Sequence, residues 1–178
     1  MMSADSFPAL PGIYRLLFLY LEPVSTLTPA VIVWLFPGAS WFYHQLIPSP
    51  LPVPSHTLDP STQMAVWQLV NCYLLLGLIS SLVFRAVRDA LPNNPAAQER
   101  ILGASFLALG IADLTHIAAT FIGLPPDLKY SPAKWNSMTH GNISSVVVLF
   151  LFRLAWYLGF GRTRYYFGKS QARLEKDK

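Results

Sequence analysis

The sequence predicts an all-α protein: an integral membrane four-helix bundle with both termini in the cytosol. Three observations support this fold class. Hydrophobic residues make up 53% of the 178-residue chain and charged residues only 12%, about half the usual charged share. Four apolar segments are each long enough for a helix to cross a bilayer core, which takes about 20 residues. They are about twice as long as a barrel strand and do not alternate in polarity, which argues against a membrane β-barrel.

We therefore expect one transmembrane domain over residues 1–178, ending in a basic cytosolic tail at 161–178. The predicted helices cover about residues 10–36, 63–84, 101–124 and 135–160.

The first segment contains Glu22-Pro23 and Pro29, and each proline removes one helical hydrogen bond. We expect the carbonyls of Leu19 and Ser25 to be left without their helical partners. Such backbone is tolerated in a membrane where protein covers it or where it lines a wet cavity.

The connection at 37–60 contains six prolines, so an extended polyproline-like backbone is expected there. Trp41, Phe42 and Tyr43 at its start are interpreted as an aromatic anchor at the membrane interface. We expect the loop side chains of His44 and His56 to be solvated.

Lysine and arginine set the orientation. Ten of the thirteen fall on one side if that side holds both termini and the connection at 85–100; the ten are Arg15, Arg85, Arg88, Arg100, Arg162, Arg164, Lys169, Arg173, Lys176 and Lys178. The positive-inside rule assigns this side to the cytosol. The basic tail is interpreted as a topology anchor, so no nucleic-acid partner is expected. A multispanning chain without a transit signal indicates the endoplasmic reticulum.

The third segment carries Asp113 and His116 within an otherwise apolar helix. A charged residue at the centre of a membrane helix costs roughly 2.5–3.5 kcal/mol on insertion scales. Such groups usually have a partner or a function. The two residues are three apart, so they share a helix face and can touch.

Polar residues of the other helices fall at a similar depth. At 1.5 Å per residue, Asp113 lies roughly 18 Å into the membrane. One polar layer is predicted, and all its side chains are expected to turn inward because lipid penalises charge. Its members are Glu22, Gln68, Asn71, Asp113, His116 and Asn142. Arg153 is the expected partner of Glu22. Contacts within such a layer could also serve only to hold the helices together.

No metal or cofactor is expected. Asp113 and His116 are too few for a metal site, which needs three or four ligands. The sequence contains no Gly-rich phosphate loop and no acidic diphosphate-binding motif. Cys72, the single cysteine, lies inside an apolar run and rules out a disulfide within the monomer.

The chain resembles an uncharacterised fungal family of small four-helix membrane proteins. The resemblance covers nearly the whole chain and rests on Pro11-Gly-Ile-Tyr14-Arg15, Glu22-Pro23, Gln68-Leu-Val-Asn71-Cys-Tyr73, Ala112-Asp113-Leu-Thr-His116, Gly141-Asn142 and Arg153. That family implies a fold but no activity. In architecture alone the chain is similar to the sterol isomerase (emopamil-binding) group and to fungal membrane-bound terpene cyclases. Those likenesses imply a lipophilic ligand in a cavity lined by acids, and no residue motif is shared with either group.

The first functional hypothesis is a cyclase or isomerase that acts by proton transfer on an isoprenoid or meroterpenoid substrate. Burial favours the neutral form of a carboxyl group, so Glu22 or Asp113 could act as the acid. His116 could accept a proton from the product cation. Aromatic faces could stabilise that cation; the candidates are Tyr14, Trp67, Tyr73 and Trp156. The expected substrate-binding residues are Gln68, Asn71, Tyr73, Asn142 and Arg153.

Two other classes remain open. One is a non-catalytic protein that binds a lipid or acts as a scaffold for a pathway enzyme. The other is a small proton-coupled transporter that uses the broken first helix as its site. Four helices without an internal repeat are few for a transporter, so this class requires a homodimer. The expected partners are thus a lipophilic small molecule, membrane lipids, and a second copy or a pathway enzyme.

Overall fold

The computed structural model describes residues 7–49, 51–52 and 57–168, and this part of the chain is helical, without β-strands. Four helical spans are long and apolar enough to cross a membrane. They are Gly12–Trp34, Pro60–Ala90, Pro95–Gly123 and Ser137–Leu158. The predicted all-α architecture with four apolar spans is confirmed, and four such helices indicate a multi-pass membrane protein.

The first span continues through its prolines. It consists of α1 (Gly12–Leu16), a π-helical turn η1 (Leu17–Leu21) and α2 (Glu22–Trp34). Pro23 lies two residues after the π-turn, whose backbone already departs from α-helical hydrogen bonding. Arg85 Nη2 donates to the Leu19 carbonyl over 3.3 Å. Pro23 has no N–H to donate to the Leu19 carbonyl, and a side chain of the second span donates to that carbonyl instead.

The second span starts earlier and ends later than predicted. It is formed by α4 (Pro60–Leu78), the π-turn η2 (Ile79–Val83) and α5 (Phe84–Ala90). Asp59 caps its start and accepts hydrogen bonds from the Ser61 and Thr62 amides. Hydrogen bonds from the Ser61 and Thr62 hydroxyls and from their amides hold the pKa of the Asp59 carboxyl well below its usual range, and the Ser61 hydroxyl has the largest effect. The prediction was based on apolar residues, so it could not include the polar first turn of this helix.

The third and fourth spans pack as a pair. The third is α6 (Pro95–Gly123), capped by the Asn94 side chain. The fourth consists of α8 (Ser137–His140), a π-turn η4 (Gly141–Ser145) and α9 (Val146–Leu158).

Short helices occupy the connections. Between the third and fourth spans lie α7 (Pro126–Lys129) and the 3₁₀ turn η3 (Pro132–Lys134). After the first span comes α3 (Ala39–Gln45), which corrects the prediction of an extended backbone for that part of the connection.

The start of this connection is also more buried than predicted. Phe42 is only 1% exposed and packs with Val33, Val66 and Val70, so it joins a core instead of anchoring the chain at an interface. The predicted solvated His56 lies outside the described residues.

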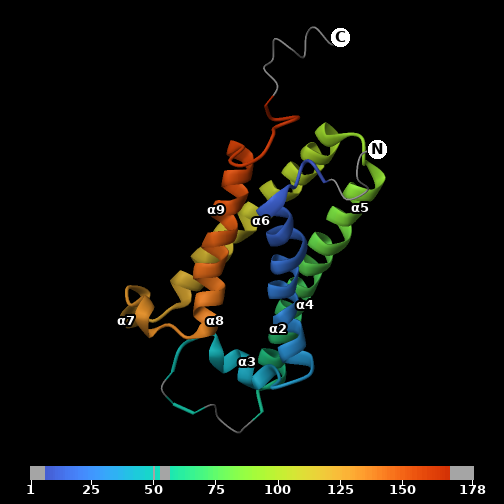
Figure 1. Cartoon of the computed structure of the whole chain (residues 1–178). Coiled ribbons are helices and arrows are strands. Elements are labelled where there is room, and N and C mark those ends of the chain that lie inside the picture. Colours follow the sequence, from blue (N-terminus) through green and yellow to red (C-terminus); the bar gives the residue numbers. More distant parts are fainter. Residues whose placement is uncertain (1–6, 50, 53–56, 169–178) are drawn as a thin grey trace.

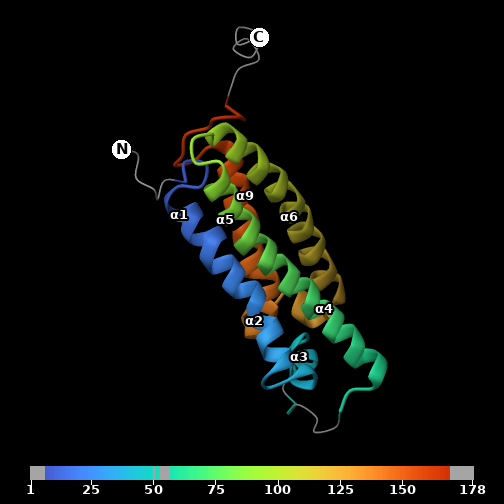
Figure 2. The same ribbon diagram turned by 90° about the vertical axis from the view of Figure 1, so that its right-hand side faces the viewer.

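The bundle is two helix pairs joined at one end (Figure 1). One pair is α2 with α4, and the other is α6 with α9. An aromatic core with members from η1, α5, α6 and α9 joins the pairs. These elements meet near the end where the start of α1 and the 160–168 segment lie (Figures 1 and 2). The largest fully buried members of this core are Phe18, Phe84, Phe106 and Trp156, each 1% exposed or less. Away from this core the two pairs leave space between them.

The described part of the basic tail is not a simple solvated anchor. Arg162 Nη2 donates to Glu99 Oε1 over 2.5 Å, and both side chains are fully buried. The Arg162 guanidinium also lies 3.9 Å from the centre of the Trp156 ring. Glu99 accepts the backbone amides of Tyr165 and Tyr166 as well. This segment is therefore locked onto the start of α6; residues 169–178 lie outside the described part.

Candidate functional site

A cavity of about 720 Å³ lies between the two helix pairs. Its walls come from α2, α4, α6, η4 and α9, with Trp41 of α3 and Met138 of α8 also in the lining. The aromatic core that contains Phe18 and Phe106 borders its charged end, where both rings contact the Arg153 guanidinium. A volume of this size lies within the range of small-molecule pockets.

Three charged side chains from three helices meet at one end of the cavity. Arg153 Nη2 donates to Glu22 Oε1 over 2.6 Å, and Arg153 Nη1 donates to Asp113 Oδ2 over 2.7 Å. We call these three residues the Arg153 cluster. The side chains of Arg153 and Glu22 are 3% and 4% exposed, whereas that of Asp113 is 12% exposed. The expected pairing of Arg153 with Glu22 is confirmed, and Asp113 joins it.

The Arg153 cluster contains two carboxyl groups and one guanidinium. Ionised carboxylates inside a protein are tolerated only when paired and hydrogen-bonded. Here Glu22 Oε2 and Arg153 Nε are buried and have no hydrogen-bond partner among the described residues. The cluster thus carries one acid more than its cation can neutralise, and some of its hydrogen-bonding capacity is unused.

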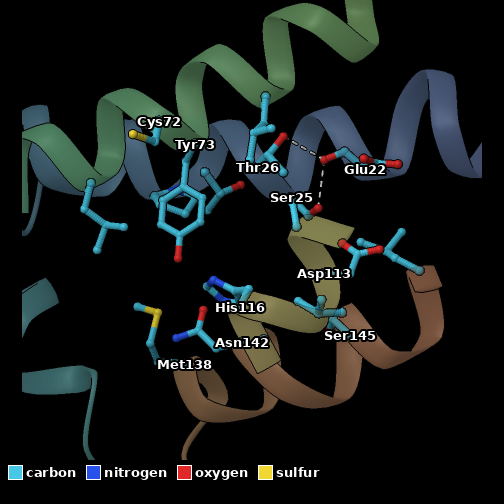
Figure 3. Close-up of a pocket in the computed structure, with 18 of the residues that line it drawn as sticks. Glu22, Ser25, Thr26, Cys72, Tyr73, Asp113, His116, Met138, Asn142 and Ser145 are labelled. Atoms are coloured by element: carbon cyan, nitrogen blue, oxygen red, sulfur yellow. Dashed lines mark hydrogen bonds between the residues drawn. The ribbon is translucent and has the colours of Figure 1, made fainter. Parts of the chain in front are cut away.

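A second polar group lies farther along the same cavity. The rings of Tyr73 and His116 meet edge to face, with centroids 6.0 Å apart. The Asn142 side chain lies next to His116 (Figure 3). These three side chains come from α4, α6 and η4, so the predicted convergence of separate spans on one site is observed for them.

Asp113 and His116 share a face of α6 but do not pair with each other. The described hydrogen bond of Asp113 goes to Arg153, while the His116 ring faces Tyr73. Because both residues line the cavity, they stand along its wall one helical turn apart. The wall therefore offers an acidic and a basic group to one bound molecule.

Hydroxyl groups that were not predicted as site residues also line the cavity. Ser25 and Thr26 of α2 follow Glu22 on the same helix face, and both donate to the Glu22 carbonyl, over 2.8 and 3.0 Å. Ser145 lines the opposite wall (Figure 3). The spacing of three and four residues from Glu22 would have indicated the first two.

The expectation that every polar side chain turns inward is wrong for Gln68 and Asn71. Both are exposed on the outer surface of α4 and do not line the cavity. The inner face of α4 is occupied by Val66, Val70 and Gly77, which are buried. At Gly77 a Cβ atom would lie 2.9 Å from Leu27, so close packing against α2 fixes the rotation of α4. That rotation sends both amides outward.

Three of the four aromatic candidates also lie away from the cavity. Trp67 is on the outer surface, where it stacks on Trp34 with ring centroids 5.4 Å apart. Tyr14 and Trp156 belong to the aromatic core. Tyr73 alone of the four lines the cavity. Within the described residues, no three histidine, cysteine, aspartate or glutamate side chains gather as a metal site.

Comparison with known proteins gives a family but no activity. Residues 7–163 match the model of a domain of unknown function, DUF7704, so the chain belongs to that family. No curated protein and no solved structure matches the chain. The match spans all four apolar helices and every residue of the cavity wall.

Proposed function

We propose that this chain is an integral membrane enzyme that transfers protons to and from one lipophilic molecule, of the isoprenoid or meroterpenoid class, held in the cavity. The observation that carries this proposal is the Arg153 cluster at the end of a largely apolar cavity. Its two carboxyl groups share one guanidinium over 2.6 and 2.7 Å. Water-poor surroundings disfavour the excess negative charge, and a proton on one carboxyl group removes it. A carboxylic acid so placed can protonate an olefin or an epoxide.

Asp113 is the better placed acid. Both carboxyl groups belong to residues of the cavity wall, but Asp113 is the more exposed of the two, at 12% against 4% for Glu22. Glu22 would then hold Arg153 in position, and the Arg153 guanidinium would stabilise the Asp113 carboxylate once the proton has left.

The reaction would return the enzyme to its starting state. Asp113 gives its proton to a substrate double bond or epoxide oxygen, and a carbocation forms. Neutral His116 removes a proton from a carbon next to the cation, so a new double bond forms and the product is an isomer of the substrate. Passage of that proton from His116 back to Asp113 completes the cycle. Tyr73 presents its ring to the cation, and Asn142 orients His116.

The same cavity supports a second candidate, a protein that binds a lipophilic molecule without changing it. The specific observation in its favour is that Arg153 already donates to both carboxyl groups, which is also what a purely structural cluster requires. The two candidates differ in what Asp113→Asn does.

The test is turnover by the purified protein in lipid nanodiscs, with polyprenyl epoxides and sterols of shifted double-bond position as substrates and mass spectrometry as the assay. We expect Asp113→Asn to lower the rate at least about 100-fold, the usual share of a general acid. His116→Gln should lower it to a similar degree.

The matched control for this experiment is Asp127→Asn, which alters an exposed acid on α7, outside the cavity. It should retain the full rate, and all variants should accumulate in membranes equally. Full turnover in Asp113→Asn would refute the mechanism. Unaltered substrate that nevertheless co-purifies with the wild-type protein would establish the binding candidate instead.

The location that fits this chemistry is the endoplasmic reticulum, with both termini cytosolic. The start of α1 and the 160–168 segment lie at one end of the bundle, which supports a shared side for the termini (Figure 1). The connection between α5 and α6 lies at the same end, close to Arg88 and Arg100. A lipophilic substrate would reach the cavity from the bilayer.

A further inference from the structure

The outward face of α4 carries two amide side chains in the middle of a membrane span. Gln68 and Asn71 are both exposed. At 1.5 Å per residue, they lie roughly 10 and 6 Å from the midpoint of the span Pro60–Ala90. Both therefore fall within a hydrocarbon core about 30 Å thick. At that depth no water is at hand to bond with an amide.

Exposed hydroxyl groups elsewhere in the spans are satisfied by their own helix. Ser105, which lies outside the cavity, donates to the Ile101 carbonyl over 3.1 Å, and Thr115, in the cavity wall, donates to the Ile111 carbonyl over 3.1 Å. Among the described residues, Gln68 and Asn71 have no such partner. An amide has two donors and an acceptor, so its bonding needs exceed what a helix backbone can offer. The two amides therefore require a partner outside the bundle.

Neighbouring residues extend the amides into a regular stripe, which we call the α4 seam. It consists of Met64, Gln68, Asn71, Leu75 and Leu78, at alternating spacings of four and three residues. Met64 and Leu75 are each 56% exposed and Leu78 is 40% exposed. This spacing is the heptad pattern by which two helices pack along a shared seam. Figure 2 shows α4 uncovered along the outside of the bundle.

We propose that the α4 seam is a dimer interface, occupied by α4 of a second copy of this chain. An amide is its own complement, since its NH₂ donates and its oxygen accepts. A two-fold axis that passes beside Asn71 would bring like amides together, so each copy supplies what the other lacks. Polar side chains of this kind bond across membrane helices, and a single asparagine in a heptad seam fixes register and dimeric state.

A comparison with the exposed face of α6 shows why the two amides, and not exposure alone, identify the α4 seam as the interface. Leu107, Ile111 and Leu114 are equally lipid-facing, at 60%, 56% and 51% exposed. Apolar side chains are well solvated by lipid and require no protein partner. The seam differs only in carrying groups that lipid cannot satisfy. It also faces away from the Arg153 cluster, so dimerisation and the proposed chemistry are separable.

Cross-linking in native membranes tests the interface. In a Cys72→Ser background, we expect Leu75→Cys and Leu78→Cys to form disulfide-linked dimers on mild oxidation. The matched control is Leu107→Cys, an exposed leucine in the middle of α6, which should remain monomeric. Cross-links at Leu107 alone, or adducts to a different protein at Leu75, would overturn the proposal.

A second measurement addresses the amides directly. Gln68→Leu combined with Asn71→Leu should raise the dimer dissociation constant in nanodiscs or liposomes roughly tenfold, by single-molecule photobleaching. These changes place apolar groups on a lipid-facing surface, so folding of the monomer should be unaffected. An unchanged dimer fraction, or a wild-type protein that is monomeric throughout, would contradict the role of the seam.

Discussion

Arg153 is the residue on which the interior of the bundle depends. It comes from α9 and binds one carboxyl group from α2 and one from α6, so it links three helices at a single point. Its guanidinium also lies 5.3 Å from the centre of the Phe18 ring. A planar, always-charged group with a fixed fork of donors suits two carboxylates, and lysine offers no such geometry.

Removal of this cation should be strongly destabilising. Arg153→Leu would leave Glu22 and Asp113 close together without their counter-ion. Breaking a buried pair on one side typically costs about 3–5 kcal/mol. We expect a large fall in the thermal unfolding midpoint of the detergent-purified protein, and only partial recovery with Arg153→Lys.

The control is a variant that removes the positive charge and both negative charges of the Arg153 cluster. Arg153→Met together with Glu22→Gln and Asp113→Asn leaves no buried charge in the cluster, and should restore much of the lost stability. If Arg153→Leu unfolds at the wild-type temperature, the cluster is not the link described above. If the triple variant is as unstable as the single one, shape and not charge is what Arg153 contributes.

At the scale of elements, the start of α6 and the segment after α9 form a second buried ionic unit. Glu99 binds Arg162 and the amides of Tyr165 and Tyr166, while Arg162 Nε donates to the Trp156 carbonyl over 2.7 Å. All of these partners come from the end of the chain. One acid on α6 thus folds the 159–168 segment back over the aromatic core.

Loss of the Glu99 carboxylate should release this segment. Glu99→Gln removes the charge that holds Arg162 and weakens acceptance of two amides. We expect faster hydrogen–deuterium exchange at residues 162–168 and faster cleavage there by trypsin, while exchange in the α2–α4 pair stays unchanged. Asp127→Asn, at an exposed position on α7, is the control. Equal exchange in Glu99→Gln and wild type would show that other contacts hold the segment.

At the scale of the whole molecule, the four spans place the connections at two opposite ends. The connection between α5 and α6 lies at the end that holds the start of α1 and the 160–168 segment, whereas α3 and α7 lie at the other (Figure 1). The excess of arginine at the first end is the basis for the proposed cytosolic location of that end.

Single cysteines test this orientation. In the Cys72→Ser background, Asn93→Cys should react with a membrane-impermeant maleimide in cells whose plasma membrane alone is permeabilised. Ser49→Cys, in the first connection, should react only after all membranes are opened. Both positions are exposed, so access differs only by the membrane. The reverse labelling order would invert the topology, and with it the side from which the Arg153 cluster is approached.

Several features of the fold and site could be predicted because they are local. Apolar length alone identifies four spans, and the insertion cost of a charge singles out Glu22, Asp113 and Arg153 as residues that require partners. The boundaries at 63 and 101 were placed too late since capping residues and polar first turns carry no apolar signal. The helix α3 was missed because prolines dominate its connection.

Residue types along each segment predict which side chains are too polar for lipid and how far along their helices they fall. Which of these side chains meet depends on how the helices pack against one another. Glu22, Asp113 and Arg153 converge, whereas Gln68 and Asn71, at a similar depth, face outward. The physical reason is that depth follows from helical rise, a property of one helix. Rotation follows from packing between helices, here the close contact of Gly77 with Leu27, and no single segment contains that information.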